Sequence, residues 1–521
     1  MIVKRTRYFW SGAAAGCAFV VVALLGRAVN ATPTLPELVQ DRLVLLMPGP
    51  VFSLLLDRFL YLGKPLLFAA LLLCQIAICG LAGIAIGRWG RPFAIITVLW
   101  LVTGVIVLPL AGRSIFAGSP AVAVVTLLAF GAYAVAFMLF ARPPAVFWKR
   151  SDEPPEPATT EQPRLPGSRF DRRRLLAGGL LGLATVILAR RAVGKLPALP
   201  PRGRALASGG VAKLTGSAPA GSTDAASTGL PPAVTPTDRF YVVSKNLFDP
   251  ELDAANWSLK VDGLVERPFE LRYSDLLAMP SVEAYRTLEC ISNEIGGDLI
   301  SNGLWTGVHF ADLLQRAGPR PGAAFILFTS IDGYTSDMQL QQAMDPDTLL
   351  AYKLNGSALP TKHGYPARIL ATDIYGMKNP KWLTHVQVVN SQRTGFWQQQ
   401  GWDEQGIVRT MSRIDTPVGG SRVPGGEVSI GGVAFAGARD IARVEVSTDG
   451  GATWTDAKLL PSLGPSTWML WQYLWQAVQP GVYTIVVRAT DGTGMVQTAR
   501  RSDPFPAGAT GYDQARIRVG S

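Results

Sequence analysis

Cysteine and histidine are the side chains best suited to bind metals or act as nucleophiles, and this 521-residue chain has few of either. The four cysteines are Cys17, Cys74, Cys79 and Cys290, and the three histidines are His309, His363 and His385. The sequence has no Cys-x-x-Cys-His run, which excludes an attached c-type haem. It also lacks the Cys/His spacings of zinc and iron–sulfur sites. No histidine lies in a stretch long and apolar enough to span a membrane, so a bis-histidine haem between membrane helices is excluded too.

Cys290 differs from the other cysteines in its surroundings. Cys17, Cys74 and Cys79 fall in apolar stretches, where we expect them to pack as small apolar side chains. Cys290 is the sole cysteine after those stretches, so it has no partner for an intramolecular disulfide. Two interpretations follow from this count alone. Cys290 is either a buried, inert thiol or a thiolate that acts as nucleophile or metal ligand.

The formal net charge of +11 is unevenly distributed. Residues 1–235 carry +15, whereas residues 236–521 carry −4. Hydrophobic residues make up 48% of the chain, and the apolar stretches lie in the basic half. A basic excess that flanks apolar stretches indicates the positive-inside pattern of a membrane protein, so we expect no nucleic-acid partner.

Five apolar stretches approach the 17–25 residues that cross a bilayer. They cover 9–28, 66–86, 93–112, 120–141 and 175–192. Basic residues flank them so that the N-terminus is predicted to be cytoplasmic and residues 193–521 extracytoplasmic, on a multi-pass membrane protein. Residues 1–150 would hold about four spans. The apolar segment 40–62 contains a Pro-Gly-Pro break and two charges, and we interpret it as interfacial or re-entrant.

The fifth stretch begins with a run of arginines. The sequence DRRRLL at 171–176 resembles a twin-arginine export signal, which serves proteins that cross the membrane folded. Ordinary positive-inside flanking is the alternative explanation. We expect residues 151–194 to form a cytoplasmic loop, this motif and a retained fifth span. Residues 195–235 are rich in Pro, Ala, Gly, Ser and Thr and are predicted to be a flexible linker.

The context of Cys290 favours a metal-binding role. Separated motifs follow one another in a fixed order: YRTLECISN (285–293), LWTGV (304–308), DGY (332–334), LAY (350–352), NG (355–356), HGYPAR (363–368) and YGMKNPKW (375–382). This set resembles the sulfite oxidase family of molybdopterin enzymes over residues 236–415, and the resemblance implies an α+β cofactor-binding domain. Residues 416–521 alternate short strands with Asp-Gly turns, which predicts an all-β sandwich. They also resemble the immunoglobulin-like domain of that family, which commonly serves dimerisation.

The resemblance implies Mo-molybdopterin as cofactor and Cys290 as the catalytic thiolate on molybdenum, a soft ligand for a metal already held by sulfur. It also implies which side chains contact the cofactor. They are Tyr241, Lys245, Asn246, Thr329, His363, Arg368, Lys378 and Lys381. In this set Lys245 stands where many relatives have a histidine, and Thr329 is equally compatible with an ordinary strand residue. His309 and His385 are expected to be core or surface histidines.

One local departure bears on the substrate. Sulfite-oxidising relatives carry arginines soon after the metal cysteine, but residues 291–295 contain no cation, and Glu294 would repel an anion. This contrast favours oxygen-atom transfer on an S-oxide or N-oxide. Sulfite or nitrate remains an alternative, and so does a non-enzymatic cell-surface protein with a degenerate cofactor domain. Because the chain offers no haem or cluster site, electrons would pass through an external cytochrome or quinone.

Overall fold

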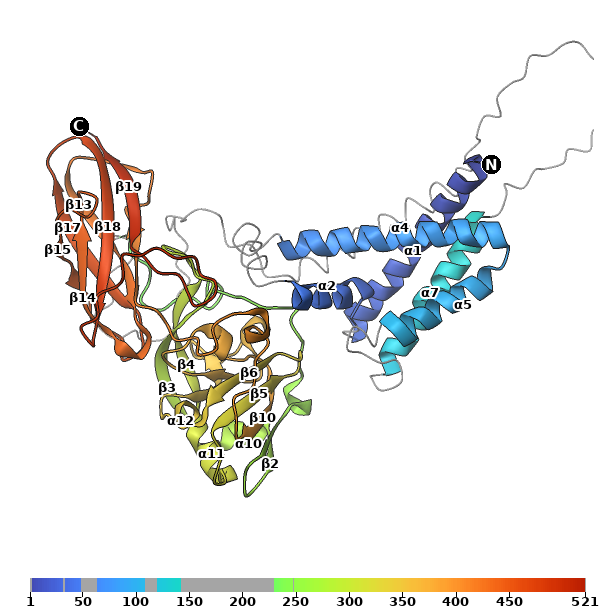
Figure 1. The fold of residues 1–521 in the computed structure, drawn as a ribbon, viewed down its shortest axis with the longest axis horizontal. Helices are drawn as coiled ribbons and strands as arrows, with labels where there is room; N and C mark the ends of the chain where they lie inside the picture. The colour runs from blue at the N-terminus through green and yellow to red at the C-terminus, as the bar shows by residue number, and fades with distance from the viewer. Residues whose placement is uncertain are drawn as a thin grey trace, which may run out of the picture. The chain divides into compact units, whose positions relative to one another are not determined.

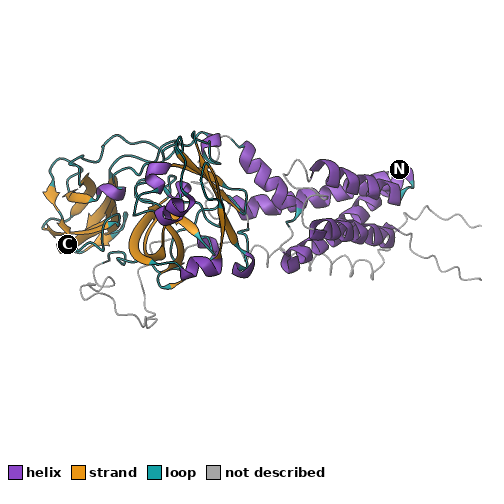
Figure 2. Ribbon diagram, turned by 90° about the horizontal axis from the view of Figure 1, so that it is seen from below, coloured by secondary structure: helices purple, strands orange, loops and turns teal. Residues whose placement is uncertain are grey.

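A computed structural model of the chain describes residues 2–30, 33–47, 63–107, 120–141, 229–246 and 248–520. These residues divide into two compact units. The helices up to Ala141 fall in the first unit and residues from 229 onward in the second. Figure 2 shows how they differ in content, with helices in the first unit and mostly strands in the second.

The first unit is a helical bundle in which α1 packs against both α4 and α7 (Figure 1). Its elements are α1 (Ile2–Asn30), α2 (Leu35–Leu46), α4 (Gly63–Trp89), α5 (Pro92–Val102), the π-helical turn η1 (Thr103–Val107) and α7 (Pro120–Ala141). Glycines bring α1 and α4 close together. A Cβ atom on Gly12 would lie 2.5 Å from the Cys79 carbonyl oxygen, so only glycine fits there.

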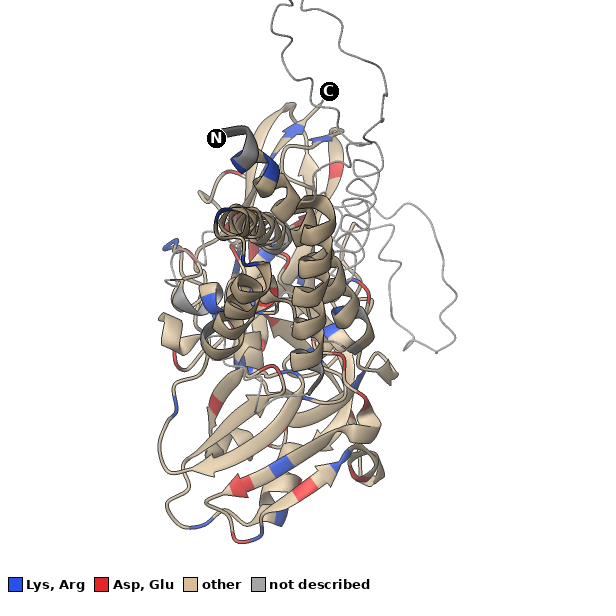
Figure 3. Cartoon of the chain, turned by 90° about the vertical axis from the view of Figure 1, so that its right-hand side faces the viewer, with Lys and Arg blue, Asp and Glu red and all other residues tan. Residues whose placement is uncertain are grey.

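Three of these helices are long and apolar enough to cross a membrane. They are Arg5–Arg27, Leu66–Trp89 and Ala123–Ala141. They match three of the five stretches that the sequence predicts. In Figure 3 most of the helical surface of this unit is free of charge, and charged residues include Arg27 and Arg88 in the last turns of α1 and α4 and Glu37 in the first turn of α2.

The remaining predicted membrane elements differ or are not described. The third stretch, 93–112, appears as an apolar helix over Pro92–Val105, which is shorter than the three spanning candidates. Segment 40–62 begins within α2, and its larger part from residue 48 lies outside the described residues. The fifth stretch, the arginine motif and nearly all of the predicted linker also lie outside them.

The second unit begins with a mixed five-stranded sheet in the order β2-β1-β10-β5-β6. Its strands are β1 (Ser258–Gly263), β2 (Phe269–Arg272), β5 (Phe325–Ser330), β6 (Thr335–Gln339) and β10 (Leu383–Val389). The helices of this region are η2 (Ala254–Asn256), α10 (Tyr273–Ala278), α11 (Phe310–Ala317) and α12 (Leu340–Ala343). In α11 the side chains of Phe310, Leu313, Leu314 and Ala317 are all buried, which is the helical spacing of one apolar face.

A second sheet has the order β3-β4-β7-β8, with β9 paired to β7. Its strands are β3 (Val282–Glu289), β4 (Ile300–His309), β7 (Leu349–Leu354), β8 (Ser357–Ala358) and β9 (Arg368–Leu370). Trp305 of β4 is fully buried in a cluster with Phe240 and Leu288. This packing holds β3 in place. The last residue of β3, Glu289, pairs with Ile300 of β4, and Cys290 follows Glu289 in the chain.

The C-terminal region consists of two further sheets, ordered β11-β13-β17-β16 and β12-β19-β18-β14-β15. The strands are β11 (Met411–Thr416), β12 (Arg422–Val423), β13 (Gly426–Phe435), β14 (Ile441–Ser447), β15 (Thr455–Asp456), β16 (Lys458–Leu459), β17 (Met469–Ala477), β18 (Gly481–Asp491) and β19 (Asp513–Val519). Strands of both sheets share one core around the fully buried Trp471. The predicted all-β content is thereby confirmed, while the immunoglobulin-like assignment stays a prediction.

Candidate active site

A pocket lies where β3 ends. Its lining comes from five parts of the chain: the segment before β1, the β3 end, the turn before β6, the short helices η3 (Thr361–His363) and η4 (Gly376–Lys378) with the residues after them, and the turn around η5 (Gln398–Gln400). The lining residues are 240–245, 288, 290–292, 332, 334, 362, 363, 368, 376, 377, 379–382, 397 and 402. The pocket therefore depends on tertiary packing.

Cys290 lies directly after β3 and lines the pocket, with 7% of its surface exposed. Its backbone N–H donates to the Leu299 carbonyl, at 2.9 Å, and its Sγ lies 3.0 Å from Ser292 Oγ. Burial raises the pKa of the Cys290 thiol, and hydrogen bonding with Ser292 opposes this rise. A metal ion would have to displace the thiol proton, because the thiolate is the form that binds metals.

Contacts within the loop hold Cys290 in place. The Asn293 side chain donates to Glu289 Oε1, at 2.9 Å, and accepts from the Leu299 N–H, at 3.0 Å. Asn293 thereby ties the two ends of the loop together. Burial raises the pKa of Glu289 to about 7, although the Asn293 hydrogen bond and the Arg413 charge lower it.

The C-terminal strands also support this loop. Arg413 of β11 donates from Nη1 to the Gly297 carbonyl, at 2.8 Å. On β3, the Thr287 N–H donates to the Ser466 carbonyl, at 3.1 Å. A Cβ on Gly296 would meet the Asp513 carboxylate at 2.5 Å, so glycine is required for this approach. The C-terminal region therefore helps to place the cysteine, besides having a core of its own.

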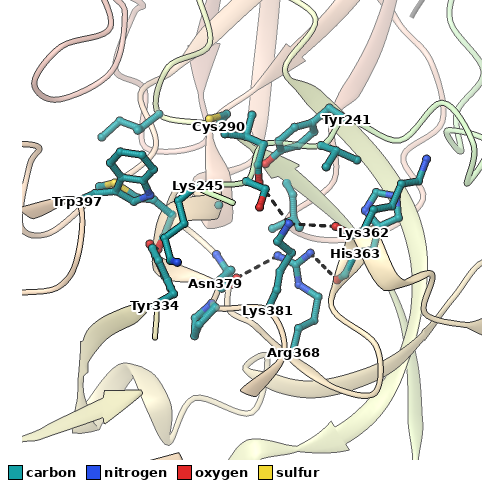
Figure 4. A pocket seen from close by; sticks show the side chains of 18 of the residues that line it. Tyr241, Lys245, Cys290, Tyr334, Lys362, His363, Arg368, Asn379, Lys381 and Trp397 are labelled. Carbon is teal, nitrogen blue, oxygen red and sulfur yellow. Dashed lines mark hydrogen bonds between the residues drawn. The ribbon is translucent and has the colours of Figure 1, made fainter. Parts of the chain in front are cut away.

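One end of the pocket is cationic. Arg368, which is 5% exposed, donates to the His363 and Asn379 carbonyls, both at 3.1 Å. Lys381 donates to the carbonyls of Lys362, at 3.0 Å, and Val243, at 3.3 Å. Among the described residues neither cation forms a salt bridge with a carboxylate. Figure 4 shows Arg368, Lys381, Lys362 and His363 gathered on the side of the view away from Trp397.

Burial dominates the electrostatics of this end, where the carboxylates of Asp249 and Asp332 attract Lys381 without forming a salt bridge with it. Burial lowers the pKa of Arg368 to about 10 and that of Lys381 to about 8. Burial and the cations of Lys381 and Arg368 lower the pKa of His363 to about 2, so this imidazole is neutral. Its Nε2 is buried without a hydrogen-bond partner among the described residues. Buried cations whose hydrogen bonds go only to carbonyls, beside an unpaired imidazole nitrogen, fit an anionic, oxygen-rich group such as a phosphate.

The other end is aromatic, and its lysine is paired with a carboxylate. Lys245 donates to Asn246 Oδ1, at 2.8 Å, and to the Asp332 carbonyl, at 2.9 Å, and its Nζ lies 3.5 Å from Asp332 Oδ2. Asn246 in turn donates to the Asp332 carboxylate, at 2.8 Å. Trp397 and Trp402 complete this end.

The structure brings together six of the nine predicted site residues. Tyr241, Lys245, Cys290, His363, Arg368 and Lys381 line the pocket. Asn246 lies behind the lining, where it orients Lys245. Gly376 leaves room for Tyr241, because a Cβ on Gly376 would lie 2.6 Å from the Tyr241 hydroxyl.

Three sequence expectations do not match the structure. Thr329 lies in β5, outside the lining, and its carbonyl accepts a hydrogen bond from Thr384 Oγ1, at 3.2 Å. Lys378 points into a buried ion pair with Asp337, at 2.5 Å, because an acidic strand residue lies beneath its turn. Glu294 is exposed and outside the lining, so it cannot repel an anion inside the pocket.

His309 and His385 lie outside the pocket lining, as expected, with hydrogen bonds to the Pro346 carbonyl and to Asp262. Sequence reasoning missed other lining side chains. They include Tyr334, Asn379, Trp397 and Trp402. Tyr334 and Asn379 belong to motifs that carry the family resemblance, so those motifs could have identified them. No spacing signal indicates the two tryptophans.

Comparisons with known proteins decide between the remaining interpretations. Residues 246–397 match the family profile described as "Oxidoreductase molybdopterin binding domain", and residues 409–502 match "Mo-co oxidoreductase dimerisation domain". The uncharacterized oxidoreductase YuiH of Bacillus subtilis is 30% identical over 177 residues, which cover 34% of this chain and 87% of that protein. The sulfite oxidase of Arabidopsis thaliana is 29% identical over 273 residues, or 43% of this chain and 70% of that protein.

The chain belongs to the sulfite oxidase family of molybdopterin-dependent oxidoreductases. Its fold resembles the sulfane dehydrogenase SoxCD of Paracoccus pantotrophus, with a TM-score of 0.50 and 24% identity over 54% of this chain and 80% of that one. Membership identifies the chain as an oxidoreductase and implies a molybdopterin cofactor. It thereby removes the alternative of a non-enzymatic protein with a degenerate cofactor domain.

Proposed function

We propose that this family member transfers an oxygen atom to or from a small, neutral substrate, with S-oxides and N-oxides favoured over sulfite. In the reducing direction, a sulfoxide, two electrons and two protons would give the thioether and water. The molybdenum cofactor, when bound, supplies the two-electron change that accompanies this transfer. An external cytochrome or quinol would supply the electrons.

The aromatic end of the pocket carries this proposal. Among the described lining residues, Lys245 is the one cation near Trp397, and it forms a salt bridge with Asp332. Arg368 and Lys381 lie at the other end. An anion such as sulfite is best held by forked, uncompensated cations, whereas a neutral oxide needs apolar contacts and one donor. The absence of a cation from residues 291–295 points the same way.

The residues of the pocket take distinct roles in this proposal. Cys290 would supply the protein thiolate to molybdenum, since a soft thiolate suits this metal. Arg368, Lys381 and His363 would hold the phosphate of the pterin, with Arg368 offering a fork and Lys381 a point charge. Tyr241 would complete the cofactor wall, and Lys245, which Asn246 orients, would lie where the cofactor meets the aromatic end.

We further propose that the chain is anchored in a bacterial cell membrane, with the enzyme on the extracytoplasmic side. The three long apolar helices and the +15 charge of residues 1–235 support this topology. The match to a dimerisation domain supports a homodimer formed through the C-terminal region, which we propose to be immunoglobulin-like.

Sulfite oxidation is the second candidate, because several curated relatives are sulfite oxidases. The sulfite oxidase of Rattus norvegicus, for example, is 32% identical over 269 residues, which cover 43% of this chain and 49% of that protein. This match leaves more than half of this chain uncovered, and the candidate gives no role to the helical unit.

One experiment separates the candidates. The full chain would be purified from a molybdopterin-competent host, its molybdenum quantified, and turnover measured with S-oxides and N-oxides using an artificial donor, and with sulfite using an artificial acceptor. We expect near-stoichiometric molybdenum and a larger kcat/KM for an oxide. A larger kcat/KM for sulfite would overturn the neutral-substrate proposal and leave the family assignment intact.

A further inference from the structure

The indole N–H of Trp402 is a buried donor without an acceptor. Trp402 lines the same pocket as Cys290, and 3% of its surface is exposed. Its Nε1 has no hydrogen-bond partner among the described residues. Buried donors are nearly always paired in folded proteins, because losing water without a replacement costs free energy. An unpaired donor on a residue of a pocket wall can be satisfied by a ligand that closes against that wall.

The surrounding structure fixes the Trp402 ring. The ring of Phe505 packs edge-on against it, with the centroids 5.2 Å apart. The neighbouring Asp403 N–H donates to the Pro506 carbonyl, at 3.0 Å. Gly401 precedes the indole with a φ of 89°, a conformation that glycine adopts readily. The C-terminal segment thus holds the ring in one orientation, which preorganises its donor.

Other polar groups at this end of the pocket are already engaged. The Tyr334 hydroxyl donates to the Met377 carbonyl, at 2.5 Å. Lys245 is committed to Asn246 and Asp332. The indole N–H is therefore an uncommitted neutral donor in a wall that also carries the thioether of Met377 and the ring of Trp397.

We propose that Trp402 binds the substrate and determines its class, by donating from Nε1 to the oxygen of a neutral S-oxide or N-oxide. This inference rests on the proposed function. Indole donates one hydrogen bond and carries no charge. It therefore suits a neutral molecule with one strong acceptor oxygen, and it stabilises an anion less than a cationic side chain would. The Met377 and Trp397 side chains would contact the alkyl groups of that molecule.

Trp471 provides a matched control inside the same protein. Its Nε1 is also buried without a partner among the described residues, but it lies in the core of the C-terminal sheets, away from the pocket lining. An unpaired indole by itself does not make a site. The location of Trp402 in the pocket wall is what distinguishes the two, and the same substitution can be made at each.

The test compares Trp402→Phe with Trp471→Phe in the molybdenum-loaded full chain, with dimethyl sulfoxide as probe and an artificial electron donor. We expect Trp402→Phe to raise the KM by about 3- to 10-fold, as for one lost hydrogen bond, with kcat and molybdenum content unchanged. Trp471→Phe should leave the KM unchanged. An unaltered KM in a fully loaded Trp402→Phe enzyme would overturn the inference. If that variant loads poorly, Trp402→His, which keeps an N–H, is compared with Trp402→Met, which does not.

A binding measurement separates this inference from the proposed function. In oxidised enzyme labelled with 5-fluorotryptophan, the Trp402 resonance is the one of 13 that Trp402→Phe or Trp402→His removes. Dimethyl sulfoxide should shift it without any turnover. A shift in an enzyme that turns over only sulfite would support the inference and overturn the function. Turnover of dimethyl sulfoxide without a shift would do the reverse, and neither shift nor turnover would overturn both.

Discussion

Each end of the pocket contains a lysine, but the two lysines differ in how their charge is balanced. At the cationic end, Arg368 and Lys381 contact backbone carbonyls, and the pKa of each is lowered by burial. At the aromatic end, Lys245 has a carboxylate partner. The comparison teaches that a lysine in a pocket is a candidate anion ligand when no carboxylate of the protein forms a salt bridge with it.

The free-energy cost of burying a cation explains why a buried cation without a salt bridge indicates a ligand site. Burying a cation without a carboxylate is unfavourable, so a protein keeps one where a ligand supplies the missing negative charge. We therefore propose that the cationic end holds the pterin phosphate and that the aromatic end receives the substrate. The four predictions below test this division, in order of decreasing effect on the loaded site.

Cys290→Ser should have the largest effect. Replacing the soft thiolate by a hydroxyl removes the proposed protein ligand of molybdenum, and turnover should fall by at least about 100-fold, more than is typical for loss of a supporting contact. The measurement is kcat per folded protein, with the molybdenum absorption spectrum as an independent readout. Cys74→Ser, at an exposed cysteine of the helical unit, is the control. Full activity in Cys290→Ser would refute the role of the thiolate.

Arg368→Met should weaken cofactor retention. A hydrogen bond to a charged group contributes about 1.5–3 kcal/mol, which corresponds to roughly 10- to 100-fold in affinity. Molybdenum content after dialysis measures this. Arg368→Lys keeps the charge but loses the fork, so its content should lie between those of Arg368→Met and the unmodified protein. Equal retention in all three proteins would show that the phosphate lies elsewhere.

Lys381 should make cofactor binding depend on pH. Its pKa in the folded, cofactor-free protein is about 8, below the ordinary 10.5, so the anion-binding charge is lost as pH rises through 8. Between pH 8 and 10.5 the unfolded chain binds more protons at Lys381 than the folded protein does. The contribution of Lys381 to the free energy of unfolding of the cofactor-free protein therefore rises with pH in this range. Reloading of cofactor should therefore weaken above pH 8. In Lys381→Met this dependence should vanish; a slope that persists would assign it to another group.

Lys378→Met should have the smallest effect on loading, although it lies three residues from Lys381. Its partner, Asp337, would be left buried and unpaired, which lowers the free energy of unfolding by about 3–5 kcal/mol. Molybdenum per folded protein should not change. Combining it with Asp337→Leu should restore much of the stability. A loss of molybdenum from folded Lys378→Met protein would instead return Lys378 to the cofactor site, as the sequence predicts.

Much of the molecule could be predicted because local patterns dictate it. The apolar stretches of α1, α4 and α7 are long enough to cross a membrane, and their length alone predicted these helices. The alternation of apolar and polar residues predicted the C-terminal strands. The motif order around Cys290 indicated the cofactor family. The predictions that did not match the structure concern side chains whose role depends on residues distant in sequence. Nothing near Lys378 in sequence reveals its partner Asp337 on β6, and nothing near Glu294 shows that it faces solvent.

The sequence by itself determined the charge asymmetry between the two halves of the chain, the lone cysteine after the apolar stretches and the family to which it points. These are properties of residue type and order. Only the tertiary structure decided which cations remain unpaired, and that Trp402, held by Phe505 some hundred residues later, lines the pocket of Cys290. The reason is physical: burial and pairing determine whether a charge or a donor is free to bind, and both depend on segments that are brought together only when the chain folds.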